Sequence, residues 1–276
     1  MGRRTGWIGG MLGVALLTPA LVSGQAWERS DVDRCEQNWG GRDSERFCTA
    51  MEATIESTGE LRVDGGMNGG VSVEGWNRDV VSVRAEIWGS APSMSDAEAL
   101  VADVELMARN GDVRAEGPRT GRRESWGVRW IVRVPARTDL ELETHNGGID
   151  ISSVDGRVDF EALNGGVRLE GLAGDVRGHT TNGGLRILLD GDRWDGRGLD
   201  VETTNGGITI VVPPGYSADL ETGTTNGGID LDFPVTVRGK IGRRLNTALG
   251  EGGPTVRAIT VNGGVKLTRS ESAIRR

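Results

Sequence analysis

Two histidines are the side chains best suited to acid–base chemistry near neutral pH. His145 and His179 stand one and three residues before asparagines of a recurring Asn-Gly-Gly tripeptide. Other copies of the tripeptide have Leu163 at the first of these positions and Glu202 at the second. Both histidines therefore look like ordinary occupants of a repeated strand, and a Ser-His-Asp site would also need a carboxylate to orient the imidazole. The sequence predicts no catalytic residue of this kind.

Paired carboxylates are the second chemistry to consider, because a general acid and a nucleophile or base together cleave glycosidic bonds. Glu143 and Glu161 are the pair that such an envelope enzyme would use. Aromatic platforms for sugars do not recur in the repeat, since Tyr216 is the only tyrosine and the 8 tryptophans are scattered. Each glycine pair precedes a strand pattern rather than a helix, which argues against a phosphate-binding loop. We expect no enzyme and no cofactor, and keep a polysaccharide-acting enzyme as the alternative.

Metal binding is the third chemistry. Calcium-binding β-rolls also repeat coils of about 18 residues with glycine-rich turns, but they carry an aspartate at a fixed place. No aspartate recurs in this way at the position four residues after each asparagine. The residues there are Ser72, Asp150, Arg168, Arg186, Thr209, Asp230 and Lys266. We therefore expect no metal site, and keep a cation-stabilised structural module as a further alternative.

Outward positions on the strand before each asparagine form an acidic stripe. Its members, with the basic residues among them, are Glu141, Glu143, Asp159, Glu161, Arg177, His179, Asp200, Glu202 and Glu221. Like charges on neighbouring coils repel one another, so the stripe is open to cations or to a basic partner. A solvated face is the simpler interpretation.

Cysteine usage and the N-terminus both indicate export. The only two cysteines, Cys35 and Cys48, can close one small disulfide loop in an oxidising compartment, whereas zinc would need two more ligands nearby. Arg3 and Arg4 precede an apolar run over residues 7–22, so residues 1–26 read as a signal peptide. The run contains glycines and a proline and is shorter than the about 20 apolar residues that span a bilayer. We expect a periplasmic or secreted protein without a transmembrane segment after cleavage.

Net charge argues against nucleic acid as a partner. The formal net charge is −8, and loss of the two leader arginines, Arg3 and Arg4, makes the mature chain −10. Such a surface repels a polyanionic backbone.

The recurring tripeptide must organise the elements that hold these side chains. It occurs seven times, with asparagines at Asn68, Asn146, Asn164, Asn182, Asn205, Asn226 and Asn262. The steps are 78, 18, 18, 23, 21 and 36 residues, and the last is twice 18, which indicates a coil of 18 residues. A fixed period indicates stacked equivalent units.

Apolar residues recur at fixed offsets from these asparagines. All fourteen residues three and five places after an asparagine are aliphatic, from Val71 in the first copy to Leu267 in the last. Apolar residues also alternate six and four places before it, although Gly178 and Thr222 interrupt this row. Alternation with period two predicts two strands in each coil.

We attribute the tripeptide to the backbone, because Asn and Gly adopt positive φ without the strain that other residues suffer. A looser return turn is marked by Gly156, Gly174 and Gly215. Two residues before the asparagine stand Thr144, Thr180, Thr203, Thr224 and Thr260. Stacked at about 4.8 Å, asparagines and threonines can hydrogen-bond to the next coil. We interpret the seven asparagines as a structural turn ladder.

The predicted fold is all-β, a parallel β-solenoid of the β-helix or β-roll kind with one helix-bearing N-terminal insert. After the signal peptide we expect an N-terminal segment with the disulfide over 27–60, the start of the solenoid over 61–135, repeat coils over 136–268 and a tail over 269–276. The helix is predicted over 94–108, with Ser95 as N-cap and Asn110-Gly111 as its stop.

Four segments in order carry a family resemblance: "NGGVSVEGWNRDVVSV", "VRWIVRVPARTDLELETHNGGIDI", the "TTNGG" corners and "LNTALGEGGPTVRAITVNGGVKL". Over roughly residues 50 to 268 they resemble the bacterial "putative adhesin" domain family, a domain of unknown function. The resemblance implies a β-solenoid and supplies neither a catalytic residue nor a ligand. The predicted function is an exported, non-enzymatic scaffold that presents its coil faces to a surface, glycan or protein partner.

Overall fold

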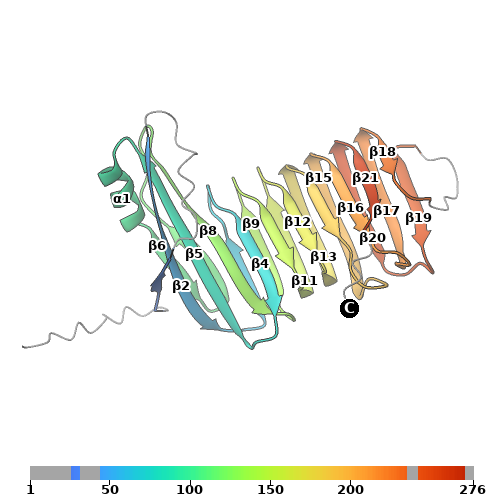
Figure 1. Cartoon of the computed structure of the whole chain (residues 1–276), viewed down its shortest axis with the longest axis horizontal. Helices are drawn as coiled ribbons and strands as arrows, with labels where there is room; N and C mark the ends of the chain where they lie inside the picture. The colour runs from blue at the N-terminus through green and yellow to red at the C-terminus, as the bar shows by residue number, and fades with distance from the viewer. Residues whose placement is uncertain (1–25, 32–43, 235–241, 271–276) are drawn as a thin grey trace, which may run out of the picture.

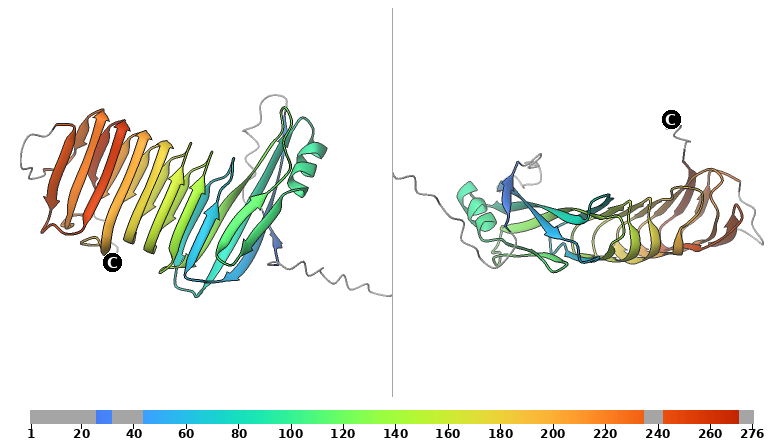
Figure 2. Two further views of the ribbon diagram at one scale, coloured as in Figure 1. Left: turned by 180° about the vertical axis from the view of Figure 1, so that it is seen from behind. Right: turned by 90° about the horizontal axis from the view of Figure 1, so that it is seen from below.

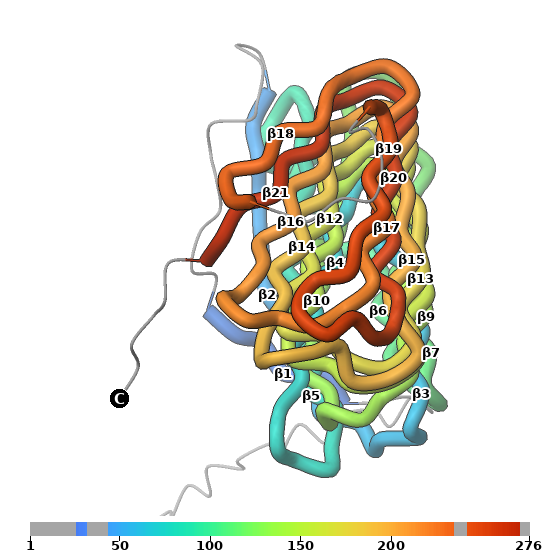
Figure 3. Tube along the Cα trace, turned by 90° about the vertical axis from the view of Figure 1, so that its right-hand side faces the viewer, coloured from blue at the N-terminus to red at the C-terminus, as the bar shows by residue number. Residues whose placement is uncertain are grey.

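Alternating strands organise the protein into two layers (Figure 1). The computed structural model describes residues 26–31, 44–234 and 242–270. Within these ranges the fold is all-β apart from one helix, as predicted, and the strands form an eleven-stranded sheet A and a ten-stranded sheet B. Viewed along the stack, the two sheets face each other and the chain winds from one to the other (Figure 3).

Each coil contributes one strand to each sheet, and strands of neighbouring coils pair in parallel. The strands that leave the Asn-Gly-Gly corners lie in sheet A in the spatial order β4 (Val71–Trp76), β10 (Ile149–Ser152), β12 (Val167–Glu170), β14 (Leu185–Leu188), β16 (Ile208–Val212), β21 (Val265–Arg269) and β18 (Ile229–Leu231). The strands that enter the corners lie in sheet B in the order β3 (Glu60–Asp64), β9 (Asp139–Thr144), β11 (Asp155–Ala162), β13 (Ala173–Asn182), β15 (Gly196–Asn205), β20 (Thr255–Asn262) and β17 (Ala218–Asn226).

Antiparallel strands complete both ends of the stack, so the two sheets are mixed. Sheet A continues from β4 into β8 (Ser125–Pro135), β5 (Val80–Ala91), β2 (Glu45–Glu56) and β1 (Glu28–Ser30). Sheet B continues from β3 into β7 (Asp112–Glu116) and β6 (Glu105–Arg109), and at its far end β19 (Arg244–Leu249) pairs with β17. Figure 2 shows the helix α1 (Met94–Ala102) at the end of the stack opposite to β19.

Aliphatic side chains from both sheets fill the space between the layers. Twelve of the fourteen aliphatic residues predicted to face inward are buried, and Ile229 and Leu231 are half-buried because β18 ends sheet A. The gap in the other row at Gly178 also has a packing reason. A Cβ atom there would lie 2.3 Å from the Phe160 ring, which therefore occupies the place of the missing side chain.

The corner requires glycine for a different reason from the predicted one. None of its asparagines or glycines has a positive φ, so the positive-φ explanation was wrong. We call each level of the stack, with its strand in each sheet and its corner, a rung. A Cβ atom on the first glycine would instead lie 1.8 to 2.1 Å from a carbonyl oxygen of the neighbouring rung. For Gly165 that oxygen belongs to Gly147, the first glycine of the neighbouring corner. Glycine is needed because the backbones of successive corners touch.

Hydrogen bonds from side chains join the corners that touch. In all corners but the first, asparagine Nδ2 donates to asparagine Oδ1 of the neighbouring rung over 2.8 to 3.3 Å. Buried threonine hydroxyls donate over 2.5 to 2.9 Å to the carbonyl of the first glycine of that rung. The first-glycine carbonyl of one rung therefore leaves no room for a Cβ atom on the first glycine of the next rung. It also accepts a hydrogen bond from the buried threonine of that next rung.

The last coil in the sequence does not occupy the last place in the stack. Strand β20 pairs in parallel with β15 on one side and β17 on the other, and β21 lies likewise between β16 and β18. The ladder therefore runs from Asn205 to Asn262 and only then to Asn226. The 36-residue step is not two coils in succession, as the spacing suggested. The chain continues from β18 to β19 and returns to fill the rung between β15 and β17.

The helix is shorter than predicted. It begins after the N-cap Ser93, whose hydroxyl accepts from Asp96 N at 3.2 Å, and ends at Ala102. The prediction was therefore wrong for Ser95 as N-cap and for residues 103–108 of the predicted helix. Residues Glu105–Arg109 form β6, because Asn110 and Gly111 both have positive φ and make a two-residue hairpin turn into β7. No helix in the described ranges is long and apolar enough to cross a membrane.

Two predictions fall largely outside the described residues. The signal peptide over 1–26 is described only at Ala26, and the tail over 269–276 only at its first two residues. Cys48 lies in β2 and is not a free thiol. Cys35 lies outside the described residues, so its pairing with Cys48 stays a prediction.

Cysteine cross-linking tests the order of the rungs. Thr204 and Val261 precede asparagines that pair in register, and neighbouring strands lie about 4.8 Å apart, which suits a disulfide. We expect Thr204→Cys with Val261→Cys to oxidise readily, and Thr204→Cys with Thr225→Cys to stay reduced because the rung of β20 lies between them. Peptide mapping by mass spectrometry identifies the linked pair. Thr181→Cys with Thr204→Cys, on neighbouring rungs, is the positive control, and efficient linkage of 204 to 225 would contradict the order.

Candidate functional site

The outward side chains of sheet B form straight rows across the rungs. One row reads, in spatial order, Arg62, Glu141, Asp159, Arg177, Asp200, Arg257 and Glu221. The predicted acidic stripe is therefore interrupted by a further arginine, since the order of the coils inserts Arg257. Its guanidinium contacts Asp200 and lies 2.7 Å from Glu202 and 4.0 Å from Glu221. These ion pairs offset the repulsion expected from the sequence.

The N-terminal half of this face is a shallow, acidic groove of about 800 Å³. Arg62 lies 3.7 Å from Glu141 and 3.6 Å from Glu143. Arg157 lies 3.4 Å from Asp159. The carboxylates along this groove are thus partly paired and open to water.

The opposite broad face, on sheet A, has a groove of about 600 Å³ that crosses the strands from β8 to β16. The second glycines of the corners form its floor, and four of these, Gly148, Gly166, Gly184 and Gly207, are exposed. No side chain rises from these positions, which leaves the backbone open. The charged residues that line the groove are Arg129, Asp150, Arg168 and Arg186.

Charge is unevenly balanced in this sheet A groove. Arg168 lies 2.5 Å from Glu170 and 3.9 Å from Asp150. Burial raises the pKa of Asp150, and the positive charge of Arg168 opposes that shift. Arg186 stands next to Arg168 in register, and its side chain makes no ion pair or hydrogen bond within the described part of the chain. Two like charges on neighbouring strands destabilise a sheet, so this arrangement has no evident role in folding.

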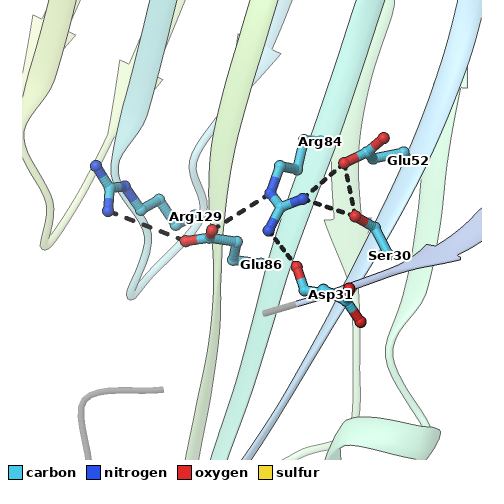
Figure 4. Close-up of polar contacts among 6 residues, drawn as sticks. All are labelled: Ser30, Asp31, Glu52, Arg84, Glu86 and Arg129. Carbon is cyan, nitrogen blue, oxygen red and sulfur yellow. Dashed lines mark hydrogen bonds and ion pairs between the residues drawn. The ribbon is translucent and has the colours of Figure 1, made fainter. Parts of the chain in front are cut away.

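A polar network ties the first strand to sheet A beside this groove (Figure 4). Arg84 on β5 donates from Nη1 to Ser30 Oγ at 2.7 Å and to Glu52 Oε1 at 2.6 Å, and from Nη2 to the Asp31 carbonyl at 2.5 Å. Its Nε donates to Glu86 Oε1 at 3.4 Å. Hydrogen bonds from Ser30 and Arg84 hold the pKa of Glu52 below its usual value. The network holds β1 against β2 and β5.

Glu86 joins this network to the sheet A groove. Its second carboxylate oxygen lies 3.9 Å from Arg129 Nη1 (Figure 4). Arg129, with 62% of its side chain exposed, therefore keeps most of its donors toward solvent at the end of the groove.

Three of the four residues considered for catalysis, Glu143, Glu161 and His179, lie side by side in register and line the sheet B groove, whereas His145 lies outside it. His145 precedes the corner asparagine, and His179 lies on β13 with its Nε2 3.5 Å from Thr181 Oγ1. Glu143 and Glu161 are brought together, since they are paired in register on β9 and β11. Among the described residues, no group of three or more His, Cys, Asp or Glu side chains is placed to hold a metal ion.

Aromatic side chains serve the core rather than a sugar platform. Trp130, Trp194 and Tyr216 are each at most 3% exposed. The indoles donate to the carbonyls of Asp64 and Gly174 at 3.1 Å. Burial raises the pKa of Tyr216 to about 12, with Asp190 and Asp192 adding to the shift. None of these rings lies on either groove.

Sequence reasoning missed the sheet A groove although its signal was present. The signal is the pair Arg168 and Arg186, which stand 18 residues apart at the position four residues after an asparagine, in a row that has no repeated aspartate. The Arg84 network left no such signal, because its members come from four segments that do not repeat.

Comparison with models of known protein families gave no match, and comparison with curated protein sequences gave none either. Among solved structures the chain resembles a putative cell adhesion protein from Clostridium sporogenes, with 10% identity and a TM-score of 0.46 over 81% of this chain and 100% of that one. It also resembles a putative adhesin from Bacteroides fragilis, with 10% identity and a TM-score of 0.31 over 80% and 97% of the two chains. A putative lipid binding protein from Parabacteroides distasonis matches with 10% identity and a TM-score of 0.29 over 83% and 98%.

Acid should loosen the attachment of β1. Because the folded-state pKa of Glu52 is lowered, its stabilisation is complete above the ordinary carboxyl pKa of about 4.3 and is lost as pH falls through the lowered value. We expect Glu52→Gln to speed hydrogen exchange in β1 at neutral pH and to match the parent in strong acid. Hydrogen exchange with mass spectrometry measures both. Glu56→Gln, exposed on the same strand, is the control, and a difference that does not change with pH would contradict this role.

Proposed function

We propose that the protein is an exported parallel β-solenoid that acts without catalysis, as an adhesin-like scaffold whose coil faces bind a surface, a glycan or a protein. The observation that carries this proposal is the registration of outward side chains. On sheet A the pairing places Asp150, Arg168 and Arg186 in one straight row. A rigid array of this kind presents many weak contacts at once to a repetitive partner.

Packing uses up the inward positions, which leaves the two broad faces for function. The inward side chains are aliphatic or form the corner hydrogen bonds. Export is supported by the leader pattern over residues 1–26 and by the predicted disulfide between Cys35 and Cys48.

One observation favours the competing function of a polysaccharide-acting enzyme. Glu143 and Glu161 are neighbours in register, and the strand spacing of about 4.8 Å is close to the separation of about 5 Å between the carboxyl groups of retaining glycosidases. However, 57% of the Glu143 side chain is exposed, and Arg62 lies 3.6 Å from its carboxylate. A shallow, open groove does not exclude water or fix a sugar ring. Binding is therefore the better supported function.

A binding screen with one variant for each face tests the proposal. Mature protein, residues 27–276, is tested against envelope fractions, cell-wall glycans and matrix proteins. We expect a saturable partner whose binding is reduced by Arg186→Glu on sheet A or by Asp159→Lys on sheet B, but not by both equally. Circular dichroism melting checks that each variant stays folded.

Failure of the screen would be equally informative. Absence of any saturable partner would count against a binding scaffold. Release of sugar ends that persists through purification and disappears in the Glu143→Gln, Glu161→Gln double variant would establish the enzyme instead. A melting temperature that falls on chelation and recovers with calcium would favour the cation-stabilised module.

A further inference from the structure

The groove on sheet A has a continuous, uncharged floor. Its exposed glycines follow one another on successive rungs. The carbonyl groups of this floor are already engaged, since the second-glycine carbonyls accept from the neighbouring rung, as Gly166 O does from Ile149 N at 3.1 Å. A ligand on this floor would therefore gain shape complementarity and close approach from it, and its charged contacts would come from the sides.

Guanidinium groups provide those polar contacts. Arg129, Arg168 and Arg186 outnumber Asp150 along the groove, which gives it a formal charge of +2. Lys266 continues the row of Arg168 and Arg186 beyond Thr209. This local positive charge stands on a chain whose net charge is −8, so the rest of the surface repels an anion and the groove attracts it.

The shape and chemistry of the groove select among anions. None of its lining residues is aromatic, so it offers no platform on which nucleobases could stack. Arginine forks bind carboxylate and sulfate oxygens through paired hydrogen bonds. The length of one sugar residue in an extended chain is close to the rung spacing of about 4.8 Å, so neighbouring acidic groups can meet Arg168 and Arg186 on neighbouring rungs.

We propose that the sheet A groove binds a linear acidic polysaccharide, with Arg186 and Arg129 as the principal contacts to its acidic groups. This inference rests on the proposed function and names the class of partner. Arg168 forms ion pairs with Asp150 and Glu170. It therefore adds positive charge to the groove, but part of its guanidinium is already paired. The glycine floor allows the sugar rings to lie against the backbone.

Binding of defined polymers to the mature protein tests this proposal. The probes are polygalacturonate, dextran sulfate of similar length, and neutral dextran. We expect the acidic polymers to bind and neutral dextran not to bind. Loss of one charge-assisted contact in Arg186→Gln should weaken binding by about tenfold, and Arg129→Gln with Arg186→Gln by more. Raised salt should weaken binding in the parent.

Matched variants separate charge from geometry. Arg157→Gln removes the same charge from the sheet B face, where Arg157 pairs with Asp159, and should leave binding unchanged. Arg186→Lys keeps the charge without the fork and should fall between the parent and Arg186→Gln. The acidic polymer that binds more tightly identifies carboxylate or sulfate as the recognised group.

Several results would overturn the inference. Neutral dextran could bind as tightly as the acidic polymers, or neither acidic polymer could bind. Arg186→Gln and Arg157→Gln could also weaken binding of the acidic polymer by the same factor. Salt-sensitive self-association that disappears in both Arg186→Gln and Asp159→Asn would show that a second copy covers the groove. A partner from the envelope screen that binds Arg186→Gln normally would remove this inference and leave the proposed function intact, whereas absence of any partner would remove both.

Discussion

Backbone contact at the Asn-Gly-Gly corner is the constraint on which the rest of the structure depends. Each first-glycine carbonyl faces the first glycine of the neighbouring rung so closely that no Cβ atom fits between them. In most corners that carbonyl also accepts a hydrogen bond from a buried threonine hydroxyl. Hydrogen bonds between asparagine side chains join the same rungs at the surface. Because the corners can approach in only one register, the strands on both sides are aligned, and the aliphatic rows meet between the sheets.

The same constraint explains how a late segment can fill an earlier rung. Any Asn-Gly-Gly coil fits beside any other, since the contacts use the backbone and side chains that all corners share. The coil of Asn262 therefore completes the ladder between Asn205 and Asn226. One consequence is electrostatic, because this insertion brings Arg257 between carboxylates that would otherwise be neighbours. On sheet A the register brings like charges together, since it places Arg168 beside Arg186. The side chain of Arg186 has no ion-pair partner among the described residues.

Much of the fold could be predicted from the sequence, because the period of 18 residues and the aliphatic offsets are local patterns. Val71 and Leu267 were assigned to the core on this basis and are buried. The role of glycine could not be predicted, since the contact of Gly165 with Gly147 lies between rungs and the tripeptide alone suggests positive φ. The end of the helix was missed because pairing of β6 with β7 overrides helical spacing over 105–109. The acidic lining of the sheet B groove was predicted as a stripe, whereas the insertion of Arg257 into that face and the open glycine floor on sheet A depend on which coils are neighbours in space.

A comparison of adjacent glycines tests the central claim most directly. A Cβ atom on Gly165 would lie 1.8 Å from the Gly147 carbonyl oxygen, whereas one on Gly166 would find its nearest neighbour, Gly184 O, at 3.5 Å. Equilibrium urea unfolding should show that Gly165→Ala lowers the free energy of unfolding by about 3 kcal/mol or more, through overpacking against rigid backbone. Gly166→Ala should lower it by less than about 1 kcal/mol. Equal effects of the two substitutions, or a stable Gly165→Ala variant, would contradict the claim that contact between successive corners governs the stack.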